Sequence, residues 1–589
     1  MKQTVYQLRR VVEYSSFFVG EPAINIRSTL KHYSRNRLIQ IAAVLSHHYG
    51  NLSWPNSQHT LFSDISRKHL PYLNKLFNAY YVRLNLVQGE KVELLTYRTS
   101  LELWRQIFAI RIDDFCDDVK EEDAELLLFK VILSINEKIL SFNERKDEYK
   151  LDELIFLNGF LTNDSNKYDF KAVMQPQMYY FHQLVDYIPS NEVLTQAVRV
   201  LFQNWGIKSW QEYFTTILCI AAKTDKYIKN QVSGVPVITS RWIALNTGSG
   251  ILSESLINHL AIGEDAFIPH KDGADKELNI DYRRFRSCPL IKLRDGYGYI
   301  VINNQLLCER LFNSLYFDFV PLINGRKNSC GFFNYNKDFI EKILFRKTFF
   351  KCISSKCFTF PAKDADKSDE KPHEPDFYAR TKYGDLIIAE CKAIKMNGEC
   401  RDDGDYVRLL EELHEKIVLK TRNLDQTRKQ YKGEPEQIGV GQLIYHIVNI
   451  ESDSFEWDTA ISDNVCYYPL LVFEDVKLVQ TGALSLINRW FYEEIEKEDK
   501  LDLPKTAIMP IMVVSINTLF LSNTLLKKIG LCRVIKSFVN KYSKYDSKTG
   551  KYDFSFGADF DAYLRQNACN HFGDETKWFH KLICSKKID

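Results

Sequence analysis

The sequence predicts a multidomain protein with a mostly α-helical N-terminal half, followed by an α/β domain that has a mixed central sheet flanked by helices. Three observations favour this fold class. The chain has 589 residues, more than one hydrophobic core normally holds. Apolar residues recur at helical spacing in the first half, whereas strand-like and helix-like segments alternate in the second. Hydrophobic residues make up 45% and charged residues 26%, which is ordinary for a globular protein.

The N-terminal part, residues 1–265, is expected to be a helical region that senses a signal, oligomerises or binds a partner protein. Apolar spacings of three and four predict helices at 27–49, 122–142 and 191–204. No fixed-period repeat accompanies them, so a helical solenoid has no support.

A polar stretch at 262–280 reads as a linker. After it, residues 289–303 predict a β-hairpin, because an apolar strand, an Asp-Gly turn and an alternating strand follow one another. With the helix that comes next, we expect 280–329 to form a small α+β element leading into the next domain.

The most informative segment is HEPDFYARTKYGDLIIAECKAIK, residues 373–395. Its parts 376–381 and 386–392 are rich in strand formers, and a Gly-Asp turn signal lies between them. Folding the chain at that turn makes a β-hairpin. We expect the hairpin to place Asp376 opposite Glu390.

The second strand of this hairpin predicts a functional site. Its apolar run at 386–389 is typical of a strand that is buried on both faces. Because side chains alternate along a strand, Glu390 and Lys392 share one face and Cys391 points to the other. Burying two charges there costs solvation free energy unless a cation or hydrogen bonds compensate. Together with Asp376, these side chains suit a metal-dependent phosphodiesterase, although an acid-x-Lys triplet alone is more often a surface ion pair.

This hairpin resembles the core of the PD-(D/E)xK nuclease superfamily, which has the restriction-endonuclease-like fold. Its two half-motifs match Pro375-Asp376 and Glu390-Cys391-Lys392. The resemblance implies a site for Mg²⁺, with Mn²⁺ as an alternative, held by Asp376, Glu390 and the backbone carbonyl of Cys391. It implies that Lys392 orients or deprotonates the attacking water.

The resemblance covers about residues 330–530 and implies a nuclease domain over that range. In this superfamily a preceding helix often bears a further glutamate. The segment 336–349 has an apolar stripe at helical spacing and reads as that helix. Glu341 is then a candidate catalytic carboxylate, and a solvated helix residue is the alternative.

The chain after the hairpin continues in the alternating pattern of an α/β domain. A long charged helix is expected at 405–431 and a core helix at 439–450. Strands are expected at 467–475 and 508–516, with a helix at 483–497 between them.

One family pattern is not matched. RecB-like members carry a glutamine and a tyrosine four residues apart on the helix that corresponds to the 439–450 segment. Here Gln442 is followed by Tyr445 at plus three and His446 at plus four. This departure gives the pattern no weight in the assignment.

Basic residues gather at the end of the long charged helix and again from 527 onward, where tyrosines lie between them. Positive charge mixed with aromatic rings suits a nucleic-acid backbone, but a charge run is more usually a solvated surface. We expect 531–589 to be a basic helical C-terminal extension. The candidate nucleic-acid contacts are Lys420, Arg422, Arg428, Lys429, Lys527, Lys528, Arg533 and Lys536.

Charge, cysteines and hydropathy narrow the class of protein. The formal net charge is +2, so binding to a polyanion requires local basic patches. The 13 cysteines include no CxxC pair, which favours free thiols in a reducing cytoplasm. The N-terminus lacks the apolar core of a signal peptide, and the apolar stretch 507–521 is too short to span a bilayer. We therefore expect a cytoplasmic protein without a membrane partner.

These features together lead us to expect a Mg²⁺-dependent DNA endonuclease of restriction or phage-defence type. Two alternatives stay open: a nuclease acting on RNA or on branched or repair DNA, and a non-enzymatic interaction protein with a remnant nuclease fold. Many members of the superfamily dimerise to cut both strands, so the resemblance also implies a homodimer or higher oligomer.

Overall fold

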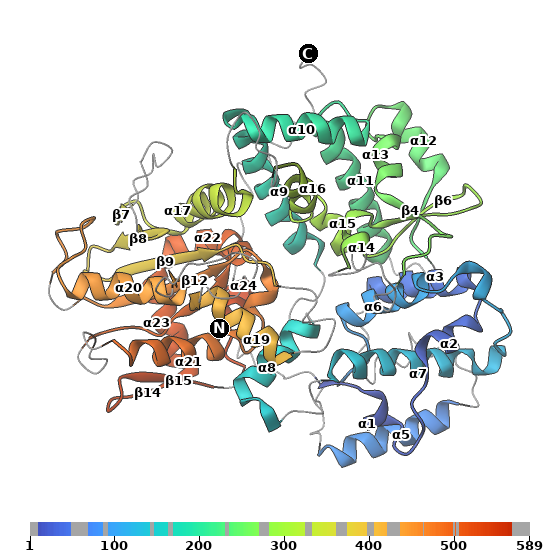
Figure 1. Ribbon diagram of the computed structural model, residues 1–589, viewed down its shortest axis with the longest axis horizontal. Helices are drawn as coiled ribbons and strands as arrows, with labels where there is room; N and C mark the ends of the chain where they lie inside the picture. The colour runs from blue at the N-terminus through green and yellow to red at the C-terminus, as the bar shows by residue number, and fades with distance from the viewer. Residues whose placement is uncertain are drawn as a thin grey trace, which may run out of the picture. The chain divides into compact units, whose positions relative to one another are not determined.

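The computed structural model shows a multidomain chain with two compact units (Figure 1). Unit 1 comprises Met1–Glu144, Leu161–Phe333 and Gly573–Asp589, and unit 2 comprises Arg145–Phe160 and Asn334–Phe572. The described residues are 10–48, 69–85, 92–141, 147–162, 169–229, 235–269, 282–323, 333–360, 374–396, 406–420, 436–462, 465–498, 501, 506–555 and 557–567.

Unit 1 is mostly helical. Its α-helices are α1 (Tyr14–Phe17), α2 (Ile26–Lys31), α3 (Arg35–His48), α5 (Leu70–Arg83), α6 (Tyr97–Phe108), α7 (Glu121–Ile139), α9 (Phe170–Tyr187), α10 (Glu192–Trp205), α11 (Trp210–Lys229), α12 (Ser240–Gly248), α13 (Glu254–His259), α14 (Arg283–Ser287), α15 (Asn304–Glu309) and α16 (Leu315–Ile323). The 3₁₀ turns η2 (Ile112–Asp114) and η4 (Ile188–Ser190) join them. Helices α7 and α10 confirm the predictions at 122–142 and 191–204.

The predicted helix at 27–49 is wrong as a single element, because the chain breaks between α2 and α3. At the break, residues 116 and 118 hydrogen-bond to the carbonyls of α2 and its C-cap. The backbone N–H of Cys116 donates to the carbonyl of Lys31 at 2.7 Å, and that of Asp118 donates to the carbonyl of His32 at 2.9 Å. A remote segment therefore satisfies the carbonyls that a continuing helix would have used.

Unit 1 also contains a four-stranded sheet in the order β3-β6-β5-β4. The predicted hairpin is confirmed as β5 (Leu290–Lys292) and β6 (Gly298–Val301), but β3 (Val237–Thr239) and β4 (Ala261–Gly263) complete the sheet from the region expected to be helical. An isolated hairpin is at best marginally stable, which explains why the 280–329 element is not separate. A short parallel pair, β1 (Arg10–Val11) with β2 (Val92–Glu93), lies elsewhere in the unit.

Unit 2 is built on a mixed five-stranded sheet in the order β13-β12-β9-β8-β7. Strands β9 (Leu386–Lys392), β12 (Tyr467–Phe473) and β13 (Met512–Ser515) are parallel, whereas β7 (Phe358–Phe360) and β8 (Phe377–Arg380) are antiparallel to their neighbours. Every residue of β9 and β12 is buried, as a central strand with both faces covered requires. The predicted hairpin, mixed sheet and strand order along the chain are confirmed.

Helices surround this sheet. They are the π-helix η6 (Tyr335–Phe345), α17 (Arg346–Cys352), α19 (Tyr406–Ile417), α20 (Val440–Glu451), α21 (Ala483–Ile495), α22 (Ile516–Ile529), α23 (Leu531–Tyr542) and α24 (Phe560–Asn567), with the 3₁₀ turn η9 (Val476–Val479). Helix α20 packs on β9 and β12, and α21, α22 and α24 pack on β13. The segment expected to be one α-helix at 336–349 is a π-helix followed by a short α-helix.

Two further expectations for unit 2 are wrong. The helix predicted at 405–431 ends at Ile417, and β10 (Leu419–Lys420) follows and pairs with β11 (Glu436–Gln437). The region from 531 is not purely helical either, because a hairpin of β14 (Ser543–Asp546) and β15 (Lys551–Phe554) follows α23. At its turn the Asp546 side chain accepts the backbone N–H of Lys548 at 2.9 Å.

The last helix among the described residues, α24, packs against the central sheet and does not form a separate extension. The carboxylate of Asp561, on α24, accepts both the backbone N–H and the hydroxyl of Ser515, each at 2.8 Å. Ser515 is the last residue of β13, so α24 caps the end of an edge strand.

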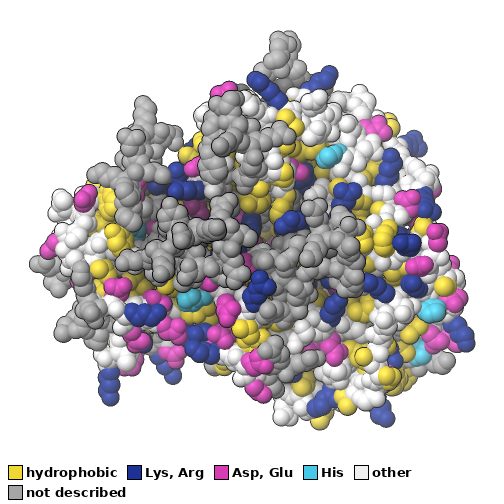
Figure 2. Space-filling model, viewed as in Figure 1, with side chains coloured by type: hydrophobic (Ala, Val, Ile, Leu, Met, Phe, Trp, Pro, Cys, Tyr) yellow, Lys and Arg dark blue, Asp and Glu magenta, His cyan; other side chains and the backbone are white. Residues whose placement is uncertain are grey.

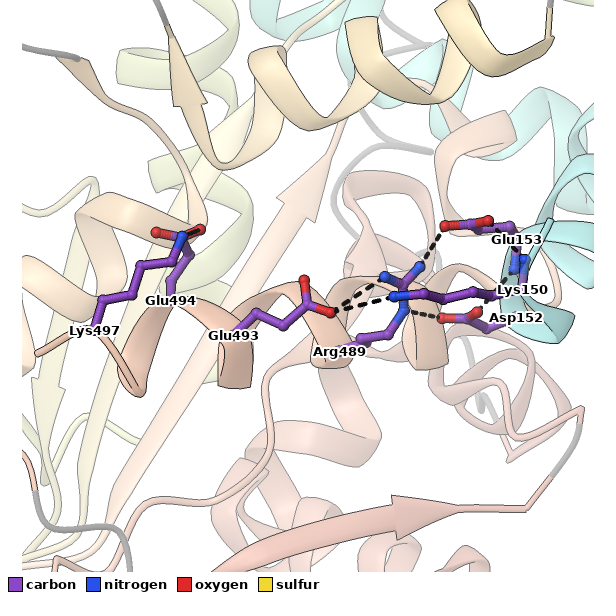
Figure 3. A network of polar contacts seen from close by, with 7 residues as sticks. All are labelled: Lys150, Asp152, Glu153, Arg489, Glu493, Glu494 and Lys497. Carbon is purple, nitrogen blue, oxygen red and sulfur yellow. Dashed lines mark hydrogen bonds and ion pairs between the residues drawn. The ribbon is translucent and has the colours of Figure 1, made fainter. Parts of the chain in front are cut away.

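Helix α8 (Leu151–Thr162) lies far from unit 2 in the sequence, yet residues 145–160 belong to that unit and not to the helical half as expected. The guanidinium of Arg489, on α21, lies 2.8 Å from Asp152, 2.7 Å from Glu153 and 3.3 Å from Glu493. Figure 3 shows these ion pairs. Gly482, with φ +94°, immediately precedes α21, and a Cβ there would lie 2.5 Å from the backbone nitrogen of Phe156. The N-terminus of α21 therefore lies so close to the backbone of α8 that a residue with a Cβ would clash at position 482.

Candidate active site

The predicted carboxylates meet where strand β8 begins. Phe377 pairs with Ala389, so the preceding residue, Asp376, lies across from Glu390, as the sequence predicts. Because β8 begins at Phe377, it supplies no strand partner to β9 beyond this point. The backbone N–H of Cys391 donates instead to Oδ2 of Asp376 at 2.8 Å. The carboxylate thus replaces a strand as the hydrogen-bond partner.

The π-helix η6 brings a third carboxylate to the same edge. Glu341 Oε1 accepts the backbone N–H of Ala393 at 3.1 Å, and Asn336 donates its side-chain amide to the carbonyl of Ala393 at 2.6 Å. Both residues lie on η6, so this helix is tied to the end of β9 at two points. π-Helical turns occur frequently at functional sites.

Glu390 is the centre of the cluster. Its Oε2 lies 3.4 Å from the ammonium of Lys392. Its Oε1 accepts the backbone N–H of Asp376 at 3.4 Å and lies 3.3 Å from Nε2 of His446. The carboxylate therefore has neighbours on both oxygens, contributed by the hairpin and by α20.

The side chains of the cluster differ in their exposure to solvent. Glu390 and His446 are each 1% exposed and Lys392 is 9% exposed. Asp376 and Glu341 are only half-buried. A ligand that arrives from solvent would thus meet these two acids first, with the buried Glu390 and Lys392 behind them.

Electrostatics in the cluster are unbalanced, because three carboxylates face one ammonium. Burial, with the charges of Glu390 and Glu341, raises the pKa of Asp376 well above its ordinary value. Burial also raises the pKa of Glu341. Although burial opposes ionisation of Glu390, Lys392 and the His446 contact lower its pKa. Burial likewise opposes the charge of Lys392, yet the acids around it raise its pKa. Burial and repulsion between the acids thus oppose ionisation of Asp376 and Glu341, and one ammonium does not compensate all three carboxyl groups.

The donor set fits a hard divalent cation. Among the described residues no three His, Cys, Asp and Glu side chains form a metal-binding group. Mg²⁺, however, commonly uses one or two carboxylates and keeps several waters. The N–H of Cys391 points to the Asp376 edge, and a strand residue's carbonyl points the same way as its N–H. The Cys391 carbonyl therefore faces the same side of β9 as Asp376, and the metal site itself stays a prediction.

The structure does not bring the basic residues of α22 and α23 to this cluster. Lys536 lies 3.6 Å from Asp385, which immediately precedes β9. About 17 Å of extended strand separates Asp385 from Glu390. Lys527 and Lys528 are exposed in the last turn of α22, whose first turn follows the site-side end of β13.

Other candidate nucleic-acid contacts are dispersed or not described. Arg533 is exposed on α23, and Lys420 lies in β10. Arg422, Arg428 and Lys429 lie outside the described residues. Figure 2 shows Lys and Arg interspersed with Asp and Glu on the visible face, without a continuous basic field. Phosphate contact by these residues stays a prediction.

Sequence reasoning missed two residues of the site. His446 lies four residues after Gln442, at the position where the RecB-like pattern has a tyrosine. That position was the one signal in the sequence that His446 belongs to the site. Arg346, the first residue of α17, donates its Nε–H to the carbonyl of Asp376 at 3.2 Å and reaches Glu374 at 3.3 Å. Nothing in its sequence neighbourhood pointed to that role.

Comparison with known proteins gives no match: no protein-family model, curated protein or solved structure matches this chain. Within the described part of the chain, no helix combines the length and apolar character needed to cross a membrane. The nine cysteines that the structure describes are free thiols. The site must therefore be interpreted from its own chemistry.

Proposed function

We propose that this protein is a Mg²⁺-dependent nuclease that hydrolyses phosphodiester bonds, and that its substrate is DNA cut internally. The observation that carries the proposal is the convergence of three carboxyl groups and one lysine at the end of β9, two of the acids having raised pKa values. A structural ion pair explains one acid beside Lys392. Asp376 and Glu341 each accept a backbone N–H, but these bonds do not offset the cost of gathering three carboxyl groups around one ammonium. A bound divalent cation would offset it.

The roles of the residues follow from their positions. Asp376, Glu390 and the carbonyl of Cys391 would hold the cation, which when bound polarises a phosphate oxygen and acidifies its water. Lys392 projects from the same strand face as Glu390, so its ammonium orients the attacking water and stabilises charge that develops on the phosphate. Glu341 fixes the end of β9 by accepting the backbone N–H of Ala393 at 3.1 Å, which places its carboxyl group beside the proposed cation site.

The decisive experiment is a cleavage assay on the full-length protein with duplex DNA, single-stranded DNA, branched DNA and RNA, in Mg²⁺ and in EDTA. Wild type should cut in Mg²⁺ and not in EDTA. Lys392→Ala should lower the cleavage rate about 10²–10³-fold, since it removes a preorganised charge from the transition state. The matched control is Lys382→Ala, an exposed lysine in the turn of the same hairpin, which should cut like wild type.

The outcomes separate the alternatives. Preference for RNA or branched DNA with the same dependence on Lys392 would replace the substrate and keep the mechanism. Wild-type cleavage by Lys392→Ala would refute the assigned site. No cleavage of any substrate and no Mn²⁺ binding by calorimetry would favour the non-enzymatic interaction protein.

The cellular context rests on the resemblance alone. Restriction or phage defence, a cytoplasmic location and a homodimer or higher oligomer belong to the proposal. Unit 1 is large compared with what catalysis needs, so we propose that it senses a signal or docks a partner protein. Sedimentation of the purified protein with and without duplex DNA tests the oligomer.

A further inference from the structure

His446 is buried beside the candidate site and takes no part in the chemistry assigned above. It is 1% exposed and projects from α20, which packs on β9 and β12. Its Nε2 lies 3.3 Å from Oε1 of Glu390, and its Nδ1 has no hydrogen-bond partner. The contact with Glu390 is therefore the interaction through which the His446 ring can influence the site.

The chemistry of the pair fixes the direction of the hydrogen bond. Glu390 pairs with Lys392, so its carboxylate is ionised and can only accept. Nε2 of His446 must then carry the hydrogen and donate it to Oε1. This assignment of the tautomer follows from the acceptor and from the absence of a partner at Nδ1.

Three donors hold Glu390, and they are not equivalent. The N–H of Asp376 and the ammonium of Lys392, both 3.4 Å away, belong to the same hairpin as Glu390. His446 belongs to a different element, so it fixes the carboxylate relative to the body of the unit. All three contacts exceed the 2.7–2.9 Å usual for charge-assisted hydrogen bonds, so each one alone holds the carboxylate weakly. Removing one donor should therefore let the Glu390 side chain adopt other rotamers.

We propose that His446 is a positioning residue: its Nε2–H holds Oε1 of Glu390, which keeps Oε2 directed to a divalent cation beside Asp376 and Lys392. This inference rests on the proposed function of the same site. It assigns His446 to orientation of a ligand, a role for which loss of the partner typically costs 10–100-fold in metal affinity.

The test measures Mn²⁺ binding to the full-length protein by isothermal titration calorimetry, with melting temperature recorded in EDTA. His446→Leu removes the donor at similar volume, and His446→Gln keeps an N–H near the position of Nε2. His446→Leu should weaken Mn²⁺ binding about 10–100-fold, and His446→Gln should restore most of that loss. The control His414→Leu changes a histidine on α19 that packs on Trp490 at 5.0 Å, and it should bind like wild type.

A second comparison isolates the contact with Glu390. In a Glu390→Gln background, His446→Leu should change Mn²⁺ affinity by less than about twofold, because the carboxylate it positions is gone. Unchanged affinity in His446→Leu alone, with wild type binding Mn²⁺, overturns the inference and leaves the proposed function standing. Equal losses in the Leu and Gln variants, with equally lowered melting temperatures, overturn it in favour of packing. Absence of Mn²⁺ binding by wild type overturns the proposed function and this inference with it.

Discussion

Replacing Asp376 by asparagine should stabilise the protein in EDTA and abolish its stabilisation by Mg²⁺. The variant replaces a carboxyl group whose ionisation the cluster opposes with a neutral amide of the same shape. The asparagine oxygen can still accept the N–H of Cys391, which now binds the aspartate at 2.8 Å. What disappears is the free-energy cost of that carboxyl group, either repulsion when it is ionised or protonation when it is not.

The size of the effect follows from the charges present. Asp376 faces two acids, Glu341 and Glu390, and one base, Lys392, so the net effect is one like charge. Two like charges about 6 Å apart repel by about 3 kcal/mol at an effective dielectric constant of 20. Because Asp376 is half-buried, solvent screening reduces this to about 1–2 kcal/mol. Such a gain raises the melting temperature of a unit of this size by roughly 2–8 °C.

Mg²⁺ should stabilise wild type and have no such effect on Asp376→Asn. At a concentration 100 times its dissociation constant, a ligand that binds only the folded state stabilises it by about 2.7 kcal/mol. Wild type should therefore gain in melting temperature on addition of Mg²⁺, whereas Asp376→Asn should not. Differential scanning calorimetry at pH 7.5 in EDTA and in Mg²⁺ measures both effects. Asp385→Asn, at the other end of β9 beside Lys536, is the control and should not gain stability. A destabilised Asp376→Asn variant in EDTA would show that the aspartate holds the hairpin and that the charge argument is mistaken.

Two further predictions concern folding. Arg105, Gln106 and burial act together on Glu102: burial opposes its ionisation, but the ion pair at 2.8 Å lowers its pKa to about 2. Its stabilisation is therefore complete above about pH 4.5 and is lost as pH falls through 2, by about 3 kcal/mol. Urea unfolding between pH 5 and 2 should show a steeper loss for wild type than for Glu102→Gln, and equal slopes would contradict the assignment. Gly482→Ala should destabilise unit 2 by more than Gly20→Ala destabilises unit 1. Both have positive φ, but only at Gly482 does a Cβ meet backbone, and equal losses in melting temperature would disprove the clash.

Local chemistry made the hairpin predictable. The turn signal and the alternation of Glu390, Cys391 and Lys392 are properties of adjacent residues, and the strand register follows from them. The apolar run before Glu390 showed that the strand is buried before any partner strand was known. These are short-range facts, and the structure confirms each.

The remainder of the site depends on distant or irregular backbone. Glu341 faces the end of β9 through a π-helix, whose i→i+5 bonds rotate side chains away from the positions that a 3.6-residue wheel assigns. His446 is 56 residues from Glu390, so only tertiary packing reveals their contact. The β14–β15 hairpin after α23 was not predicted, because the lysines in this stretch were interpreted as candidate nucleic-acid contacts. The signal for its turn is Gly550, whose φ is +71°.

The partnership of α8 with α21 has a consequence for synthesis of the chain. Asp152 leaves the ribosome 337 residues before Arg489, the side chain it will bind. At about 5–20 residues per second, the earlier helix waits roughly 15–70 s for its partner. During that interval Phe156 and Phe160, which are buried in the folded chain, lack the rest of unit 2. A nascent chain therefore exposes the apolar side chains of α8 while the rest of unit 2 is synthesised. A shortened gene that begins at residue 334 encodes unit 2 without α8.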